Sequence, residues 1–461
     1  MLGWLITIYA LLFAFLTWRR FDVALAIFFF ALPSYLIRFN VGHLPTTLLE
    51  MMFGIITIDW VVRYHKRNMA HGTWNIRRHK TLFCAIALFL LAATVSVFNS
   101  THLRAAMGEW KTFYVEPIVM FLIIVTMSPQ QFNNLTIKQS KNFIIFGLVA
   151  GGLVTSLLAI YQHFTGWMVP EAFWANQNTY RATAWYGFPN AVGLFLAPII
   201  PFAVYSTIQT WKKIQSHKLS VISHKKLKLT AYGLRLTAAV LTIPASIFAI
   251  YFAKSTGALI GLAAGLLFFL FFYNKKSRLI VCLVSLVGIV SLVSLPTNNP
   301  VKQELLLQDR SGQIRLGIWN ETWEFLKDNP ILGAGLASYQ EKIKPYHTTV
   351  NNENIEIFHH PHNIFLTMWV NLGLMGLIGF ILIIIWFFKT SWNNLTILHP
   401  RRISLGLKQF NNSTIYLASS MVVILVAGLV DSPYIKNDLA MLFWLLPALL
   451  ILQKNGGIVQ K

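Results

Sequence analysis

The sequence predicts an all-α polytopic membrane protein with about 12–13 transmembrane helices and a helical loop domain on one side of the membrane. Apolar residues make up 56% of the 461 residues and charged residues only 12%, whereas soluble domains contain roughly 25% charged residues. Apolar runs long enough to cross about 30 Å of hydrocarbon recur along the whole chain. We therefore treat residues 1–461 as a single polytopic membrane domain.

Thirteen apolar runs qualify as spans, or twelve if the first two do not both cross the membrane. Each run is close to the length of helix that a bilayer requires. The runs cover residues 3–18, 21–37, 46–62, 81–98, 112–127, 142–162, 191–210, 236–253, 257–273, 279–296, 363–388, 413–430 and 439–453.

The distribution of charge between the spans predicts which loops face the cytoplasm. Alternate loops contain 24 Lys and Arg and no Asp or Glu, at 63–80, 128–141, 211–235, 274–278, 389–412 and after 452. By the positive-inside rule these loops are cytoplasmic, and the complementary loops lie outside. The net charge of +22 therefore follows membrane topology, and we expect no nucleic-acid partner.

The longest polar segment, residues 297–362, is expected to fold as a cap on the outer face, followed by the C-terminal spans at 363–453. Residues 297–361 contain eight acids and six Lys or Arg. Within this segment, 314–329 has the apolar spacing of one helical face, at positions 316, 319, 323 and 326. Pro330 ends that helix, and packing or interfacial anchoring accounts for Trp319 and Trp323 better than sugar stacking does.

The histidine cluster at the end of the cap, His359-His360-Pro361-His362, has three interpretations. The histidines could bind a metal, but Pro361 interrupts the geometry and no HExxH pattern accompanies them. We therefore expect neither a metal nor another cofactor. They could also be surface histidines without a role. The third interpretation is that His362, at the mouth of an apolar span, acts as a general base or orients an acceptor hydroxyl.

Cations in the outer loops form a second group of candidates. Arg181 is the only basic residue between spans six and seven, Arg315 opens the cap helix, and Lys254 stands at a span boundary. A diphosphate-linked lipid requires cations at the lipid boundary, and the planar guanidinium matches phosphate oxygens in paired hydrogen bonds. Snorkelling toward lipid headgroups is the alternative role for each cation taken alone.

Taken together, these segments resemble the O-antigen ligase/polymerase superfamily of membrane glycosyltransferases over roughly residues 145–390. The motifs that carry the resemblance are Arg181 with Gly187-Phe188-Pro189-Asn190, Lys254-Ser255-Thr256-Gly257-Ala258, Ser311-Gly312 with Arg315 and Trp319, Asn329-Pro330-Ile331-Leu332-Gly333-Ala334-Gly335, His362-Asn363-Ile364-Phe365-Leu366 and Asn371-Leu372-Gly373-Leu374-Met375-Gly376. One position departs from the family pattern. Family members commonly carry Ser-Arg-Gly where this chain has Ser255-Thr256-Gly257, so Lys254 would have to supply the third phosphate contact.

The resemblance implies a GT-C-like fold and a metal-independent, inverting transfer of a glycan from undecaprenyl diphosphate to an acceptor hydroxyl. The site would lie on the outer face of the bacterial cytoplasmic (inner) membrane, among membrane lipids. Arg181 and Arg315 would hold the diphosphate, His362 would activate or orient the acceptor, and Asn363 would support His362 or cap the helix. The acceptor stays open between a lipid, a glycan and a protein.

Two other classes of function compete with this hypothesis. A flippase or transporter of lipid-linked oligosaccharides predicts inverted repeats and ionisable residues deep in the spans. The sequence has no evident repeat, and the ionisable residues Glu50, Asp59 and Glu116 lie near span ends. A receptor or scaffold would leave His362 and both arginines without a role. The transferase hypothesis therefore accounts for more of the sequence.

Overall fold

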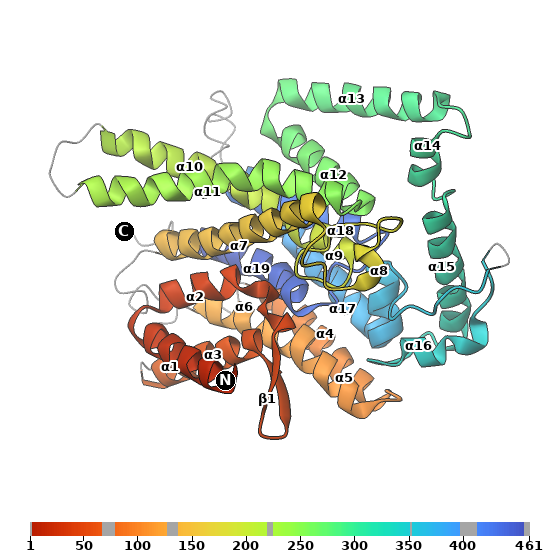
Figure 1. The fold of residues 1–461 in the computed structure, drawn as a ribbon, viewed down its shortest axis with the longest axis horizontal. Helices are drawn as coiled ribbons and strands as arrows, with labels where there is room; N and C mark the ends of the chain where they lie inside the picture. Colours follow the sequence, from red (N-terminus) through yellow and green to blue (C-terminus); the bar gives the residue numbers. More distant parts are fainter. Residues whose placement is uncertain are drawn as a thin grey trace.

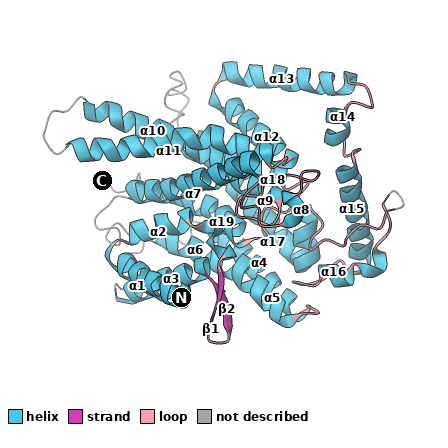
Figure 2. Cartoon of the chain, in the orientation of Figure 1, coloured by secondary structure: helices cyan, strands magenta, loops and turns pink. Residues whose placement is uncertain are grey.

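The computed structural model is an all-α polytopic membrane protein, as the sequence predicts (Figures 1 and 2). The structure describes residues 2–66, 79–126, 137–218, 225–350, 353–396 and 413–455. Within these ranges, seven helices are long and apolar enough to cross a membrane, and four shorter apolar helices accompany them.

The elements before the cap are α1 (Leu2–Arg19), α2 (Phe21–Phe30), the 3₁₀ helix η1 (Leu32–Leu36), β1 (Arg38–Val41), β2 (Leu44–Thr47), α3 (Leu48–Lys66), α4 (Lys80–Phe98), α5 (Leu103–Glu109), the π-helix η4 (Trp110–Val115), α6 (Glu116–Thr126), α7 (Ile137–Thr165), α8 (Ala172–Ala175), α9 (Pro189–Leu196), the 3₁₀ helix η6 (Ala197–Ile199), α10 (Ile200–Lys218), α11 (Lys225–Phe252), α12 (Thr256–Tyr273) and α13 (Lys275–Ser294). The cap and the C-terminal part comprise α14 (Pro300–Leu305), α15 (Arg310–Asp328), α16 (Tyr339–Lys342), the 3₁₀ helix η7 (Lys344–Tyr346), α17 (Ile364–Thr396), α18 (Ser413–Ala427) and α19 (Asn437–Asn455).

Each predicted span corresponds to helix, but the second span is shorter than predicted. Residues 21–37 form only the ten-residue helix α2 and the turn η1. The following residues form a β-hairpin in which Arg38 pairs with Thr47 and Val41 with Leu44. Figure 1 shows this hairpin projecting from the side of the helical bundle. A continuous apolar run therefore does not by itself guarantee one straight crossing.

Helices α18 and α19 lie at the centre of the bundle, and α12 packs closely against α18. Gly261 and Gly265 lie one turn apart on α12, where a Cβ atom would come within 2.8 Å of the Val423 carbonyl oxygen or 2.5 Å of the Val423 side chain. Small residues at this spacing let two membrane helices approach closely. The contact fixes the cap end of α12 beside the end of α18, where the candidate site lies.

The cap lies at one end of the bundle. In Figure 1, α15 runs across the direction of α7, α10 and α11. The structure corrects the predicted orientation of α15 in part. Leu326 on the predicted apolar face is buried, but Leu316 and Trp323 on the same face are 40% and 47% exposed. Ile318, Phe325 and the polar Thr322 are buried instead. The buried face includes polar residues that bond within the cap, and apolar spacing alone does not reveal them.

The cap docks onto α17 at a break in that helix. Gly373 has φ +68° and ψ −176°, which is not helical, and this break lets Leu374 N–H donate to Ile331 O at 3.0 Å. Ala334 N–H donates to Val370 O at 2.6 Å in the same junction. A Cβ atom on residue 373 would lie 2.0 Å from Ile331 O. Only glycine fits there, since it tolerates both the positive φ and the contact.

We expect Gly373→Ala to destabilise the protein by about 2–4 kcal/mol, because it combines a backbone clash with a left-handed conformation. Thermal unfolding in detergent measures this change. Gly288→Ala in α13 is the matched control, since a Cβ atom there meets no atom within 4 Å. Equal melting temperatures for the two variants would contradict the requirement for glycine where the cap docks onto α17.

Candidate active site

Two adjoining cavities lie where the cap meets the ends of α9, α12 and α18. The first, of about 540 Å³, is the α12 cavity, lined by α12, α14 and the end of α18. The second, of about 420 Å³, is the histidine cavity, lined by His359, His360 and His362. The cavities share a common wall formed by Arg181, Asn190, Leu194, Ser311, Arg315 and Asp431. Both predicted arginines belong to this wall.

Arg181 is held by the end of α11. Its Nε donates to Ala253 O at 2.9 Å, and one terminal nitrogen donates to Lys254 O at 2.9 Å and to the Asn190 side chain at 2.8 Å. The last carbonyls of a helix lack partners within the helix, and the negative end of its dipole favours a cation. The guanidinium also lies 5.3 Å from the centre of the Trp174 ring. Arg181 is therefore fixed without a carboxylate partner.

The loop that carries Arg181 is itself fixed by Gln162 on α7. The Gln162 side chain is fully buried; its oxygen accepts from Thr183 N–H and Ala184 N–H, and its nitrogen donates to Met168 O and Ala184 O, all within 3.0 Å. Every hydrogen-bonding group of this amide is thus used. The feature of the sequence that points to Gln162 is a single glutamine within an otherwise apolar span.

Arg315 is held by the segment that follows α18. Its Nε donates to Val430 O at 2.9 Å, and another nitrogen donates to Ser311 Oγ at 2.8 Å. Burial, and next the nearby charge of Arg315, lower the pKa of Arg181. Within the described ranges, neither arginine forms a salt bridge. Two close guanidinium groups repel each other, so this wall favours a bound anion.

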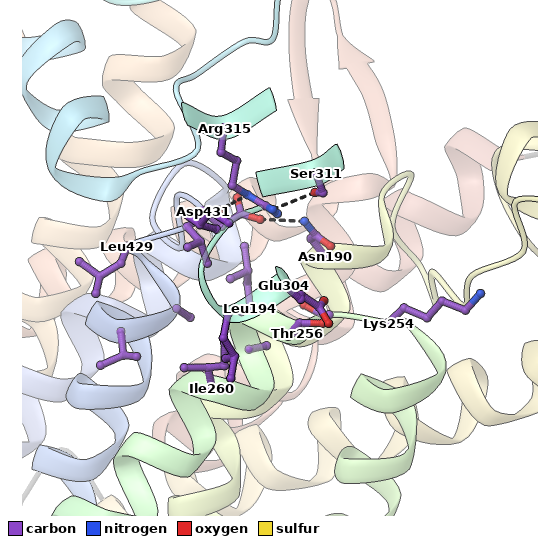
Figure 3. A pocket seen from close by; sticks show the side chains of 18 of the residues that line it. Asn190, Leu194, Lys254, Thr256, Ile260, Glu304, Ser311, Arg315, Leu429 and Asp431 are labelled. Atoms are coloured by element: carbon purple, nitrogen blue, oxygen red, sulfur yellow. Dashed lines mark hydrogen bonds between the residues drawn. The ribbon is translucent and has the colours of Figure 1, made fainter. Parts of the chain in front are cut away.

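His362 lies beside Asp431, with 3.3 Å between His362 Nδ1 and Asp431 Oδ1. Ser432 N–H also donates to Oδ1 at 2.8 Å, and Asn190 Nδ2 donates to Oδ2 at 3.0 Å. Because Asn190 accepts from Arg181 as well, hydrogen bonds connect Arg181, Asn190, Asp431 and His362 in one chain. Figure 3 shows Asn190 of α9, Ser311 and Arg315 of α15, and Asp431 after α18 converging on one place.

The ionisation of Asp431 follows from these contacts. Burial opposes its charged form, but the hydrogen bond with His362, the electrostatic influence of His362 and then of His360, and the Ser432 N–H hold the pKa of Asp431 well below its usual range. A carboxylate in this position orients the imidazole ring through Nδ1. Asp431 is absent from the residues that the sequence predicts, although it lies in one of the acid-containing outer loops.

The backbone of His362 adopts a left-handed conformation with φ +49°, which is uncommon for a residue other than glycine. Two neighbours hold it there. The Trp319 indole donates to Pro361 O at 2.9 Å, and His362 N–H donates to His360 Nδ1 at 3.3 Å. Trp319 therefore positions the histidine segment. Strained backbone of this kind is a reason to suspect function.

His360, His362 and Asp431 could also hold a metal ion, because one ligand atom of each lies within 4.8 Å of the others. In the structure these groups are already hydrogen bonded to one another or to Asn190 and Ser432. Burial, and next the charge of His362, lower the pKa of His360 to about 3, so His360 is neutral at pH 7. A direct His–Asp pair accounts for these contacts without an ion.

Of the other two predicted residues, Lys254 acts through its backbone instead of its side chain, and Asn363 caps a helix, which is one of the two roles expected for it. Lys254 lies on the α12 cavity, but Figure 3 shows its side chain extending away from Arg315 and Asp431. Its backbone, with φ +48°, ends α11, and its carbonyl accepts from Arg181. Asn363 caps α17, since its oxygen accepts from Phe365 N–H and Leu366 N–H at 3.0 and 3.1 Å. It lines neither cavity within the described residues.

These features define an α-helical multi-pass membrane protein with a wall that carries two arginines and with a His–Asp pair beneath a cap. Residues 238–381 match the family described as O-antigen ligase. This match confirms the resemblance to the O-antigen ligase/polymerase family, and it covers Lys254, Arg315 and His362.

A protein of Haemophilus influenzae, described as uncharacterized, is 27% identical over 278 residues. The aligned region covers 55% of this chain and 60% of that protein.

Glu109 lies on the histidine cavity. Burial raises the pKa of its carboxyl to about 7, against the opposing effect of the Ala337 N–H. Because the pKa of Glu109 is higher in the folded protein than in the unfolded chain, ionising Glu109 lowers the free energy of unfolding. This loss is complete above about pH 7 and absent below the ordinary pKa of about 4.3. We therefore expect Glu109→Gln to raise the melting temperature at pH 8 and to leave it unchanged near pH 4.5. Unfolding scans in detergent at the two pH values check this; a pH-independent difference would contradict it.

Proposed function

We propose that this protein is a membrane glycosyltransferase of the O-antigen ligase or polysaccharide polymerase type. It moves a glycan from an undecaprenyl-diphosphate-linked donor to an acceptor hydroxyl on the outer face of the cytoplasmic membrane. The observation that supports this most directly is the hydrogen-bonded chain from Arg181 through Asn190 and Asp431 to His362. It joins an anion-binding group to a candidate base.

The donor diphosphate binds at the common wall, between Arg181 and Arg315. Both guanidinium groups use backbone carbonyls as acceptors, so their positive charge stays available to phosphate oxygens. The lipid chain extends into the α12 cavity, where Leu194, Ile260 and Val426 supply apolar surface. Only 17% of the apolar window of α12 is buried within the protein, so this cavity adjoins a helix that faces lipid.

The acceptor enters the histidine cavity on the other side of the wall. His362 Nε2 takes the proton of the acceptor hydroxyl while that oxygen forms a bond to the anomeric carbon of the donor sugar. The bond from that carbon to the diphosphate oxygen breaks, and its electron pair leaves with the diphosphate. The arginines stabilise the developing charge in fixed positions, and Asp431 stabilises the imidazolium. Attack opposite the leaving group inverts the anomeric centre, and no metal takes part.

The outer location follows from charge. The loops predicted to be cytoplasmic hold 24 Lys and Arg without an acid, and the cap lies on the opposite side by alternation of the spans. A transporter of lipid-linked glycans would place its ionisable residues at mid-membrane. The ionisable residues of the candidate site lie instead where the cap meets the helix ends, which favours a transferase.

Replacing His362 by Ala is expected to lower glycan transfer by about 100- to 10,000-fold, because the general base is lost. Asp431→Asn is expected to lower it less, since the ring remains. Transfer is measured with the purified protein in proteoliposomes, using extracted lipid-linked glycan as donor. His102→Ala is the matched control, because His102 is exposed and pairs only with Glu341 among the described acids.

Transfer by His362→Ala at the wild-type rate would remove the assigned base. The same assay with EDTA separates the two interpretations of the histidines. Unchanged transfer is expected, whereas loss of transfer that a divalent ion restores would establish the metal site. Transport of the intact donor without any transfer, in wild-type protein, would favour a flippase.

Arg181→Lys is expected to raise the KM for the donor by about 10-fold or more. The planar guanidinium group of Arg181 bonds three acceptors, and a single lysine ammonium group cannot reproduce that geometry. Arg310→Lys at the start of α15 is the control, since Arg310 is exposed and pairs with Glu353. Donor titrations in proteoliposomes measure both variants. A donor KM equal to that of wild type in Arg181→Lys would exclude the phosphate role of Arg181.

A further inference from the structure

Glu109 is a chemically prominent group of the histidine cavity that the proposed reaction does not use. It ends α5, and the π-helix η4 follows at once. Glu109 and Phe113 are four residues apart and both line the cavity. The Tyr434 hydroxyl donates to Phe113 O at 2.9 Å, which satisfies a carbonyl in the altered turn. Turns of π-helix are frequent at functional sites, and this one aims Glu109 and Phe113 in one direction.

The carboxylate of Glu109 is only half satisfied by the protein. Its Oε2 accepts from Ala337 N–H at 2.9 Å. In the part of the chain that the structure describes, no other group bonds to Glu109 and no cation pairs with it. Glu109 is half-buried, and a carboxylate that is partly removed from water without a counter-ion is unfavourable. A ligand hydroxyl that donates to Oε1 would relieve this cost, so Glu109 is suited to accept a hydrogen bond from a bound ligand.

Other side chains of the histidine cavity suit a sugar. The aromatic residues Phe113, Trp174, Phe188 and Phe358 line it together with Glu109. Ligand sites commonly combine apolar and aromatic walls with a few polar groups that fix orientation. A pyranose ring presents C–H faces to aromatic rings and hydroxyl groups to carboxylates. The cavity offers both kinds of contact beside His362.

We propose that Glu109 determines acceptor specificity, and that the histidine cavity takes a sugar acceptor. Glu109 Oε1 accepts a hydrogen bond from one hydroxyl of the sugar while a neighbouring hydroxyl of the same sugar transfers its proton to His362. A serine or threonine side chain has a single hydroxyl and cannot satisfy both groups. This inference rests on the proposed function and narrows its acceptor from a lipid, glycan or protein to a glycan.

Glu109→Gln tests the proposal with little disturbance of the fold. The glutamine carbonyl keeps the bond from Ala337 N–H, while its NH₂ group, a donor only, replaces the open oxygen. The acceptors are glycosides of the sugars found in the surface glycan, each offered intact and with single hydroxyls removed, and a peptide containing serine and threonine. We expect Glu109→Gln to raise the KM for the intact glycoside by about 10-fold or more, with a smaller change in kcat.

The deoxy-glycosides make the test specific. Removing the hydroxyl that Glu109 binds should raise the KM of the wild-type protein but add little in Glu109→Gln, because the partner is already lost. Glu324→Gln, an exposed acid of α15 that pairs with Lys327, is the control and should behave as wild type.

Two results would overturn the inference while leaving the proposed function intact. One is transfer by Glu109→Gln with the wild-type KM for every glycoside. The other is peptide modified by the wild-type protein as well as the best glycoside. Absence of any transfer by the wild-type protein, to glycoside or peptide, would instead reject the proposed function itself.

Discussion

Backbone carbonyls at the ends of two membrane helices hold the whole site together. Beyond α18, the carbonyls of Gly428, Leu429 and Val430 accept in turn from Ile364 N–H, the Asn363 side chain and Arg315 Nε. At α11, the carbonyls of Ala253 and Lys254 accept from Arg181. A helix leaves its last carbonyls unpaired and carries negative potential there. The fold uses these carbonyls in place of carboxylates, and two cations are therefore fixed without being neutralised.

That choice of partner decides what the site can bind. A guanidinium paired with Asp or Glu has little net charge left for a ligand, whereas one that bonds neutral carbonyls keeps it. The one carboxylate at the wall, Asp431, is engaged by His362, Asn190 and Ser432. The wall therefore remains cationic toward the cavities while its acid stays committed to the histidine. Anion binding and proton acceptance can coexist within a few ångströms for this reason.

Strain is concentrated in the same segments. His362, Lys254, Ala184 and Ala337 all have positive φ without being glycine, and each lies in a segment that carries or supports a site residue. Such conformations cost about 1–3 kcal/mol each and persist only where surrounding contacts determine them. Here Trp319, the end of α11, Gln162 and Glu109 supply contacts of that kind. The strained turns lower the stability of the fold, and in return they hold the side chains that they carry in fixed directions.

Much of the fold and part of the site could be predicted from the sequence, and the division has a physical reason. Hydropathy locates spans because each must be long and apolar, and the histidine cluster and the cations stand out as polar groups at span ends. The sequence shows Gln162 as a polar residue in a span but does not show its main-chain partners, and the Lys254 carbonyl that Arg181 meets is a group that any residue can offer. Asp431 bonds the side chains of His362 and Asn190, which only the fold brings beside it. No pattern of side-chain types encodes which carbonyl Arg181 or Arg315 will meet. The family-like motifs near Gly333 and Gly373 were visible, yet only the fold reveals that one docks into the other.

The arrangement of the two cavities gives the proposed reaction its direction. In the proposed reaction, donor and acceptor enter from opposite sides of a wall whose residues would bond the leaving group on one side and the base on the other. Asn190 and Asp431 connect those functions, so a diphosphate drawn toward Arg181 alters the same network that orients His362. Charge leaving with the diphosphate and charge arriving on the imidazole then develop within one hydrogen-bonded unit. A site built this way needs no mobile cofactor to couple bond breaking to proton transfer, since the coupling lies in the chain of four side chains itself.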